Sequence, residues 1–202
     1  MNTPDPFLIL ASASATRREI LHQADVAHVC EPSGVDEDIL KEQGQAAGRA
    51  VEDVALDIAR AKAAAVSERN PNAYVLAADQ MMECDGRWLD KPATLDAARE
   101  NLMFLRGRTH RLISAATIWR GGEERWWDSA EAHLGVRAFS DEFLEDYLRT
   151  GGDEILASVG AFRLESRGVQ LFDRIDGDYF TILGLPLLPL MAFLRREGML
   201  AT

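Results

Sequence analysis

Continuous apolar runs alternate along this chain with stretches in which apolar residues recur at helical spacing. Apolar runs bounded by turn residues are typical of buried strands. Such runs predict strands at residues 7–11 and 73–78. Residues 110–120 and 124–139 are predicted as two further strands, joined across Gly121-Gly122. Asp176-Gly177 is a dipeptide that favours tight turns, so it predicts a hairpin between residues 168–175 and 178–183.

Apolar residues spaced three and four apart predict the helices. They cover residues 16–24, 45–68, 95–105 and 141–149, and a last helix after Pro186 that ends at Glu197. Thr94 and Ser140 stand at the N-cap positions of two of them. Residues 30–38 are predicted as a loop. The alternation of the two element types predicts an α/β fold with a long mixed β-sheet flanked by helices, and no linker divides residues 1–202 into separate domains.

Composition narrows the possible classes of protein. The net charge is −11 over 202 residues, which argues against broad nucleic-acid binding because that needs a basic surface. Cys30 and Cys84 fit neither a metal spacing nor a disulfide framework, so we expect reduced thiols. Residues 1–7 lack the features of a signal peptide, and the apolar stretch 179–194 is too short and too broken to span a bilayer. We therefore expect a cytoplasmic protein that does not enter membranes.

The loop after the first predicted strand contains small residues and then two arginines. It reads Ala11-Ser12-Ala13-Ser14-Ala15 and leads into Arg17-Arg18. Free amides at a helix N-terminus, hydroxyls at Ser12 and Ser14 and the fork of Arg17 together suit an anion. The alternative is structural: a serine-capped helix that packs closely on the strand and carries surface arginines.

Two charged residues lie on otherwise apolar patterns. Lys62 shares a helical stripe with Val51, Ala55 and Ile58, so it is either functional or a lysine whose ammonium group reaches out to water. Asp79 follows a buried apolar run, at the end of the predicted strand, where ligands of α/β sheets gather. A rigid strand can hold such an aspartate as a metal ligand or as a base, and we favour this over a capping role.

The remaining charged candidates lie in predicted loops. Asp36, Glu37 and Asp38 form either a solvated acidic run or a site for a hard divalent cation. Lys91 is held by the following proline and is otherwise an ordinary loop lysine. The chain has no helical histidine pair, no G-x-S-x-G motif and no Walker lysine loop, which weakens zinc-hydrolase, serine-hydrolase and P-loop interpretations.

Taken in order, these pieces resemble the Maf family of nucleotide pyrophosphatases. The matching motifs are LILASASATRREIL, VDED, IARAKA, LAADQ, LDKP with RGRTH behind it, GAFRLES and GDYFTILGLPL. They span the chain from Leu8 to Pro186. The resemblance implies an elongated, inosine triphosphatase-like α/β fold of one domain, with two lobes and a central cleft. It also implies hydrolysis of a nucleoside triphosphate to the monophosphate and pyrophosphate with a divalent metal, Mg or Mn.

The resemblance also assigns roles to individual residues. Asp79 matches the proton acceptor, and Glu37 and Asp79 are the expected metal ligands. The other polar positions expected around the phosphates and the metal are Ser12, Arg17, Lys62 and Lys91. In the mechanism that follows, Asp79 activates a water that attacks the α-phosphorus. Arg17, Lys62 and Lys91 stabilise the developing charge.

Three positions match those that set base specificity in the family: Thr16, Gln80 and Glu165. The branch active on dTTP and UTP tends to have arginine, threonine and glutamine there, whereas Gln80 and Glu165 resemble the 7-methyl-GTP branch. A carboxylate accepts hydrogen bonds from a guanine edge and is repelled by the acceptor oxygens of thymine or uracil. Ala15 departs from the proline that is frequent in the family, which predicts a less rigid loop.

We therefore predict a pyrophosphatase that favours 7-methyl-GTP. The alternatives are a dTTP/UTP pyrophosphatase, or a nucleotide-binding regulator of septum formation without turnover. Trp126 and Trp127 are neighbours on a predicted strand and so point to opposite faces. One of the two is available for a contact in a homodimer.

Overall fold

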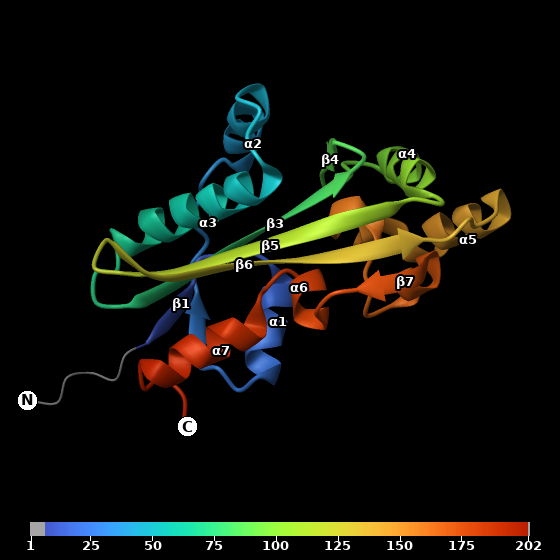
Figure 1. Cartoon of the computed structure of the whole chain (residues 1–202). Helices are drawn as coiled ribbons and strands as arrows, with labels where there is room; N and C mark the ends of the chain where they lie inside the picture. The colour runs from blue at the N-terminus through green and yellow to red at the C-terminus, as the bar shows by residue number, and fades with distance from the viewer. Residues whose placement is uncertain (1–6, 202) are drawn as a thin grey trace, which may run out of the picture. The chain divides into compact units, whose positions relative to one another are not determined.

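The structure is a computed structural model that describes residues 7–201 (Figure 1). Residues 1–6 lie outside the described residues. Most of the segment 1–7, for which the sequence predicts no signal peptide, therefore falls outside them. The chain divides into two compact units. Unit 1 comprises Met1–Gln80, Ile113–Ala130 and Leu183–Thr202, and unit 2 comprises Met81–Leu112 and Glu131–Ile182. This division agrees with the expectation of two lobes, and the central cleft stays a prediction.

The strands of residues 7–201 form one seven-stranded sheet in the order β2-β1-β3-β5-β6-β7, with β4 paired to β3. Their bounds are β1 Leu8–Leu10, β2 His28–Cys30, β3 Tyr74–Cys84, β4 Arg87–Leu89, β5 Thr109–Arg120, β6 Glu123–Val136 and β7 Phe172–Asp176. β1 runs parallel to β2 and β3, whereas β4 and β7 pair antiparallel with β3 and β6. The predicted mixed α/β sheet is therefore confirmed.

In unit 1, helices cover both faces of the sheet (Figure 1). α3 (Val51–Ser67) packs Ala63 and Val66 against Ile9, Val75 and Ala77 of β1 and β3. On the other face lie α1 (Ala15–Gln23) and α7 (Leu187–Arg196). Phe193 of α7 packs its ring 6.3 Å from Tyr74 and 5.8 Å from Trp126. Two-sided burial of this kind explains why β1 and the first five residues of β3, Tyr74 to Ala78, are continuously apolar.

The faces of β3 decide where the polar residues at its centre point. Side chains alternate along a strand. Val75 and Ala77 face α3, so Asp79 faces α3 as well, while Gln80 points to the opposite face. The sequence places Asp79 at the end of a strand over residues 73–78, but β3 continues to Cys84. Asp79 is therefore held inside a strand, which fixes its backbone on both sides.

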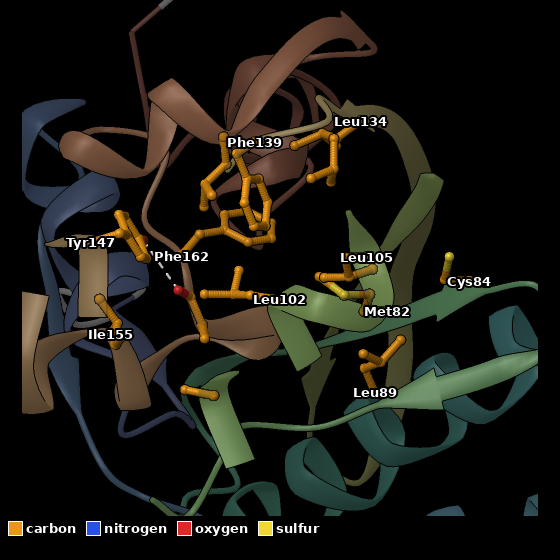
Figure 2. Close-up of a cluster of buried hydrophobic side chains, with 14 of the residues drawn as sticks. Met82, Cys84, Leu89, Leu102, Leu105, Leu134, Phe139, Tyr147, Ile155 and Phe162 are labelled. Atoms are coloured by element: carbon orange, nitrogen blue, oxygen red, sulfur yellow. Dashed lines mark hydrogen bonds between the residues drawn. The ribbon is translucent and has the colours of Figure 1, made fainter. Parts of the chain in front are cut away.

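Unit 2 has its own apolar core, which Figure 2 shows in close-up. Met82 and Leu89 of the β3–β4 hairpin pack there with Leu102 and Leu105 of α4 (Leu95–Leu105). Tyr147 of α5 (Asp141–Gly151) donates its hydroxyl to the backbone oxygen of Ala161, 3.1 Å away. Three 3-10 helices complete the unit: Gly152–Ala157, Val159–Ala161 and Arg167–Leu171.

Several predicted helix boundaries are confirmed by their caps. Thr94 and Ser140 accept from the backbone amides of Ala97 and Phe143, as N-cap residues do. The single helix predicted over residues 45–68 is wrong, because the chain breaks before Val51 and Gly48 adopts a φ of +64°. The loop predicted to residue 38 is also wrong at its end. Asp36 caps a further helix there, α2 (Glu37–Ala46).

The hairpin predicted at Asp176-Gly177 does not form. β7 pairs with β6 instead, and the following segment is the short helix α6 (Tyr179–Ile182). Gly177 has a φ of +136°, and a Cβ at this position would lie 2.6 Å from the Cβ of Ala132. The glycine is therefore required by close approach to the neighbouring strand, a reason that the turn pattern in the sequence does not distinguish.

Within residues 7–201, the structure bears on the expectations for the two cysteines, for membrane-spanning helices and for the Trp126-Trp127 pair. Cys30 is exposed, Cys84 is buried, and both are free. No helix in this part of the chain combines the length and the apolar character needed to cross a membrane. Trp126 packs inward on α7, whereas Trp127 is 52% exposed, with the guanidinium of Arg60 over its ring.

Candidate active site

Asp79 is the most buried carboxylate group of the predicted site, with 3% of the residue exposed. Its Oδ1 accepts a hydrogen bond of 2.7 Å from the ammonium group of Lys62. Its Oδ2 is buried and has no hydrogen-bond partner among residues 7–201. A buried polar atom normally has a partner, so an unpaired carboxylate oxygen points to a ligand, a proton or a metal that completes the site.

Lys62 reaches Asp79 from α3, and its position on the apolar stripe of that helix is confirmed. Its Nζ lies 2.7 Å from Asp79 Oδ1, 2.8 Å from Glu37 Oε1 and 3.5 Å from the backbone oxygen of Ala78. An ammonium group has three N–H donors. All three therefore have partners, so the side chain of Lys62 holds two carboxylates together instead of reaching out to water.

Glu37 is the one member of the acidic run that joins this cluster. Asp36 is used as the N-cap of α2, where it accepts from the amides of Asp38 and Ile39. Asp38 faces solvent and lies 3.8 Å from Lys41. Glu37, in the first turn of the helix, turns inward to Lys62 and keeps 43% of its side chain exposed. It is thus the carboxylate of the cluster that solvent can reach.

Arg17 is the third residue of α1 and is 8% exposed. Its Nε donates to the backbone oxygen of Gly184 at 2.8 Å, and its Nη1 donates to the hydroxyl of Ser12 at 3.3 Å. Burial lowers the pKa of Arg17, while the charges of Asp79 and Glu37 raise it. An arginine stays charged in proteins, so this guanidinium is a buried positive charge beside two carboxylates.

The loop that precedes α1 is organised by its two serines. The hydroxyl oxygen of Ser14 accepts from the amide of Arg17 at 3.2 Å and caps the helix, and that of Ser12 accepts from the amide of Ser14 at 3.2 Å. Because both oxygens act as acceptors, each hydroxyl keeps its hydrogen to donate. Thr16 is half-buried in the first turn. The predicted anion site and the predicted serine cap are therefore compatible in one loop.

The pKa directions of the two carboxylates differ. Burial raises the pKa of Asp79 above its ordinary value, and the charges of Lys62 and Arg17 offset only part of that rise. Burial also acts to raise the pKa of Glu37, but Lys62, Lys41 and Arg17 together bring it below its ordinary value. Asp79 is therefore the stronger base of the pair, and Glu37 is the carboxylate that stays ionised.

Gln80 lies next to Asp79 in sequence but on the opposite face of β3. Its Nε2 donates to the hydroxyl of Ser114 at 3.1 Å, and Ser114 is fully buried in β5. This bond restrains the amide that the sequence assigns to base recognition. Ser114 itself was not predicted, because a lone serine in an apolar strand gives no signal by its pattern.

The remaining predicted residues belong to unit 2. Lys91 is exposed in the loop before α4. Glu165 follows the second 3-10 helix, and its Oε1 accepts from the Nε of Arg163 at 3.1 Å. The sequence did not predict this arginine partner, which takes part of the acceptor capacity of Glu165.

The carboxylates of this cluster bear on whether the site suits a metal ion. Within residues 7–201, no group of three or more His, Cys, Asp or Glu side chains is placed to hold one. Two carboxylates do converge, and one of their oxygens, Asp79 Oδ2, is buried and unpaired. Mg²⁺ is commonly held by one or two carboxylates together with phosphate oxygens of the substrate. The residues present therefore fit a divalent ion that arrives with a phosphate ligand.

The chain is similar along most of its length to proteins of one known family. The family model described as Maf-like protein matches residues 7–197. The chain belongs to the Maf family. A Maf-family relative from Granulibacter bethesdensis, named nucleoside triphosphate pyrophosphatase, is 45% identical over 94% of this chain and 96% of its own. Another, from Rhizobium meliloti, is named 7-methyl-GTP pyrophosphatase and is 44% identical over 96% of this chain and 97% of its own. Relatives with the two names are thus equally similar to this Maf protein.

Among solved structures, a HAM1 protein from Coxiella burnetii is 13% identical, with a TM-score of 0.43 over 66% of this chain and 74% of its own. We draw nothing from so weak a likeness. In this Maf protein, the predicted residues Ser12, Ser14, Arg17, Glu37, Lys62 and Asp79 do converge within unit 1. The sequence did not predict the contact of Arg17 with Gly184, because a glycine before a predicted helix gives no sign of a partner 167 positions away.

Proposed function

We propose that this protein is a nucleoside triphosphate pyrophosphatase that cleaves the bond between the α- and β-phosphates. The products are a nucleoside monophosphate and pyrophosphate. The observation that carries the proposal is the environment of Asp79. Its carboxylate is buried, has one unpaired oxygen and is bound by Lys62, and the charges of Arg17 and Glu37 act on its pKa. The names of the Maf relatives support the same activity.

Asp79 acts as the proton acceptor. A general base works best when its pKa lies near the working pH, and burial raises the pKa of Asp79 in that direction. Its Oδ2, which has no partner among residues 7–201, has two lone pairs: one takes the proton from the attacking water, and the other would face the metal ion. Lys62, bound to Oδ1, keeps the carboxylate in one orientation during this step.

Lys62 is then a positioning residue. The sequence suggests that it contacts the phosphates, but its three donors already have acceptors in Asp79, Glu37 and the backbone of Ala78. By bridging the two carboxylates, it reduces their mutual repulsion. This arrangement allows two acidic groups to stay close to an anionic substrate.

The phosphates are bound at the N-terminus of α1. The Nη2 of Arg17 has no hydrogen-bond partner among residues 7–201, and it is not fully buried. The hydroxyls of Ser12 and Ser14 keep their hydrogens for a ligand, as argued above. Donors at a helix N-terminus favour an anion. Lys91, which belongs to unit 2, is proposed to add a further charge on the strength of its motif alone.

The charges of the cluster explain why a divalent cation, Mg²⁺ or Mn²⁺, is part of the proposal. Arg17 and Lys62 are balanced by Glu37 and Asp79, so the cluster carries no excess positive charge for a triphosphate. Glu37 and Asp79 are the residues that would hold the ion. When bound, it neutralises phosphate charge and polarises the phosphorus–oxygen bonds.

For the base, we propose a preference for 7-methyl-GTP. Glu165 is a carboxylate, which accepts from the N1–H and N2–H donors of guanine, and N7-methylation adds positive charge to the base. Gln80, restrained by Ser114, is the second recognition residue. Thr16 is the third position and lies one residue before Arg17, at the helix end where the phosphates bind.

Three further expectations remain proposals. Residues 1–202 act as one functional domain, which the match over residues 7–197 supports. The protein acts in the cytoplasm, where the free thiols Cys30 and Cys84 stay reduced. A homodimer contact is proposed at the exposed ring of Trp127.

A panel of triphosphates tests the function. The purified protein is given 7-methyl-GTP, GTP, dTTP and UTP, each with Mg²⁺ or Mn²⁺, and both products are identified by phosphorus NMR. We expect monophosphate and pyrophosphate, with the highest kcat/KM for 7-methyl-GTP. Faster turnover of dTTP and UTP would overturn the base preference alone. Binding of the triphosphates without product would overturn the proposed enzymatic activity and favour the alternative of a nucleotide-binding regulator without turnover.

A further inference from the structure

The guanidinium group of Arg17 is held by neutral partners only. Its Nε donates to the main-chain oxygen of Gly184, and its Nη1 donates to the hydroxyl of Ser12. Other arginines of unit 1, such as Arg60, donate to a carboxylate instead, in that case Glu124 at 2.8 Å and 3.0 Å. A carbonyl and a hydroxyl fix the orientation of a guanidinium without pairing its charge with an anion. Arg17 is thus immobilised without a direct ion pair, while Asp79 and Glu37 act on its charge from a distance and its Nη2 has no partner among residues 7–201.

Gly184 lies against the edge of the guanidinium that carries Nε and Nη2. A Cβ built on Gly184 would lie 3.5 Å from Nε and 3.4 Å from Nη2. It would also lie 3.7 Å from the amide carbon of Gln80. The backbone at this position therefore touches both the arginine proposed to bind phosphate and the glutamine proposed to read the base. Any side chain here would narrow the space around both.

The conformation of Gly184 is one that other residues rarely adopt. Its φ is +100°, which is open to glycine and strained for residues with a Cβ. The residues that follow are buried: Leu185 is completely covered, and Leu187 begins α7 with 4% exposure. The carbonyl of Gly184 is thus set by a rigid, buried segment. It lies 167 positions from Arg17 in the chain.

We infer that Gly184 is a positioning residue for the pyrophosphatase reaction. Its carbonyl holds Arg17 so that Nη2, which has no partner among residues 7–201, is presented to the phosphates of the substrate. This inference rests on the proposed function, which it deepens. A guanidinium fixed in advance loses less entropy on binding, and its alignment matters most in the transition state. Gly184 itself does not touch the reacting atoms.

The hydrogen bond can be tested without turnover. The side-chain Nε–H of Arg17 is assigned by its loss in Arg17→Lys, and its exchange with solvent is measured by NMR in the wild-type protein. We expect exchange at least about tenfold slower than that of Arg18, which is exposed on the next position of the same helix. Equal exchange rates at the two arginines would overturn the inference, whatever the activity of the protein.

The functional effect is tested with Gly184→Ala. Relief of the backbone strain at a φ of +100° should shift the carbonyl that holds Arg17 and lower kcat/KM by on the order of tenfold to a hundredfold, mainly through kcat. The matched control is Gly198→Ala in the same unit, where φ is +71° and no atom lies within 4 Å of the added Cβ. Its kcat/KM should stay within about twofold of wild type, because this strain is remote from the site.

A double-mutant cycle separates positioning from general damage to the fold. If Gly184 acts through Arg17, adding Gly184→Ala to Arg17→Lys should cost less than about twofold more, since interacting residues are not additive. A full, additive loss in the Arg17→Lys background would overturn the inference. Affinity for inorganic tripolyphosphate with Mg²⁺, measured by calorimetry, follows the same cycle without hydrolysis. If the wild-type protein bound tripolyphosphate but did not hydrolyse nucleoside triphosphates, the proposed function would be wrong. The role of Gly184 would then be decided by the affinities of the four proteins in the cycle.

Discussion

Asp79 in unit 1 and His110 in unit 2 are both buried, with polar atoms that lack a hydrogen-bond partner among residues 7–201. Asp79 lies among charges: Lys62 contacts it, and Arg17 and Glu37 act on it through their fields. His110 lies among rings, 5.5 Å from Phe162 and 5.9 Å from Phe172. Charged neighbours make the first site ready for a ligand, whereas aromatic neighbours make the second a neutral part of a core.

The pKa directions express the same contrast. Burial raises the pKa of Asp79, which makes it a stronger base at the pH where a triphosphate is fully ionised. Burial, together with the charge of His133, lowers the pKa of His110 to about 4, so the ring is neutral at pH 7. Burial therefore opposes the charged form at both positions, but only Asp79 has cations beside it that keep a charged form accessible.

The largest expected effect is that of Asp79→Asn. The amide cannot accept the proton, so kcat should fall by roughly 10²–10⁴-fold. Stability should be unchanged or higher, because the raised pKa means that the fold disfavours the charged carboxylate. The measurements are pyrophosphate release and thermal unfolding at pH 7.5. Asp38→Asn, an exposed aspartate of α2, is the control and should behave as wild type. An active Asp79→Asn would refute its role as the base.

Lys62→Met should lower kcat/KM by on the order of tenfold to a hundredfold, because Asp79 and Glu37 lose the group that aligns them. Since the charge of Lys62 lowers the pKa of Asp79, removing it should move the acid limb of the pH–rate profile to higher pH. The profile of kcat/KM against pH is the measurement. Arg195→Met, which removes an exposed cation from α7, is the control and should leave the profile unchanged. An unshifted acid limb with normal turnover would mean that Lys62 only fills space.

His110 should make unit 2 sensitive to acid. Its folded pKa of about 4 lies below the ordinary value of 6.5, so the unfolded chain binds the proton first. Stability is then complete above pH 6.5 and is lost as the pH falls toward 4, by roughly 3 kcal/mol in all. His110→Leu should remove this dependence and leave kcat near wild type. Denaturant unfolding between pH 4 and 7.5 checks it, with the exposed His22→Gln as control. Equal pH dependence in wild type and His110→Leu would contradict this account.

The smallest expected effect is that of Glu165→Gln on base choice. Losing a charge-assisted hydrogen bond to guanine lowers the preference for 7-methyl-GTP over UTP. Arg163 already occupies one oxygen of Glu165, so we expect a change of about tenfold at most. The ratio of kcat/KM values for the two substrates is the measurement. A ratio that does not change in the variant would remove Glu165 from base recognition.

The sequence predicted those parts of the site whose signals are local. Lys62 stands out because a lysine on an apolar stripe is unusual, and Asp79 because it interrupts an apolar run. Residues that act through distant contacts gave no such signal. Ser114 contacts Gln80 from 34 positions away, and Gly184 contacts Arg17 from 167 positions away. Nothing in the pattern around either residue distinguishes it from an ordinary strand serine or a helix-breaking glycine.

The fold shows the same limit. Asp85 and Gly86 join β3 to β4 in a tight turn that their residue types favour, and both adopt positive φ, at +52° and +77°. Asp176-Gly177 has the same residue types but is followed by α6, because Gly177 is there to let β6 approach. Likewise, the acidic run predicts a loop, but Asp36 serves as the N-cap of α2. Residue type restricts the backbone, and tertiary contacts choose among the conformations that remain.

The central claim is that the charged cluster around Asp79 directs a water molecule to the α-phosphorus. Hydrolysis of 7-methyl-GTP in water enriched in oxygen-18 tests it directly, with mass spectrometry of both products. The account predicts one labelled oxygen in the monophosphate and none in the pyrophosphate. Label in the pyrophosphate, or release of labelled inorganic phosphate, would place the attack at another phosphorus and contradict the account.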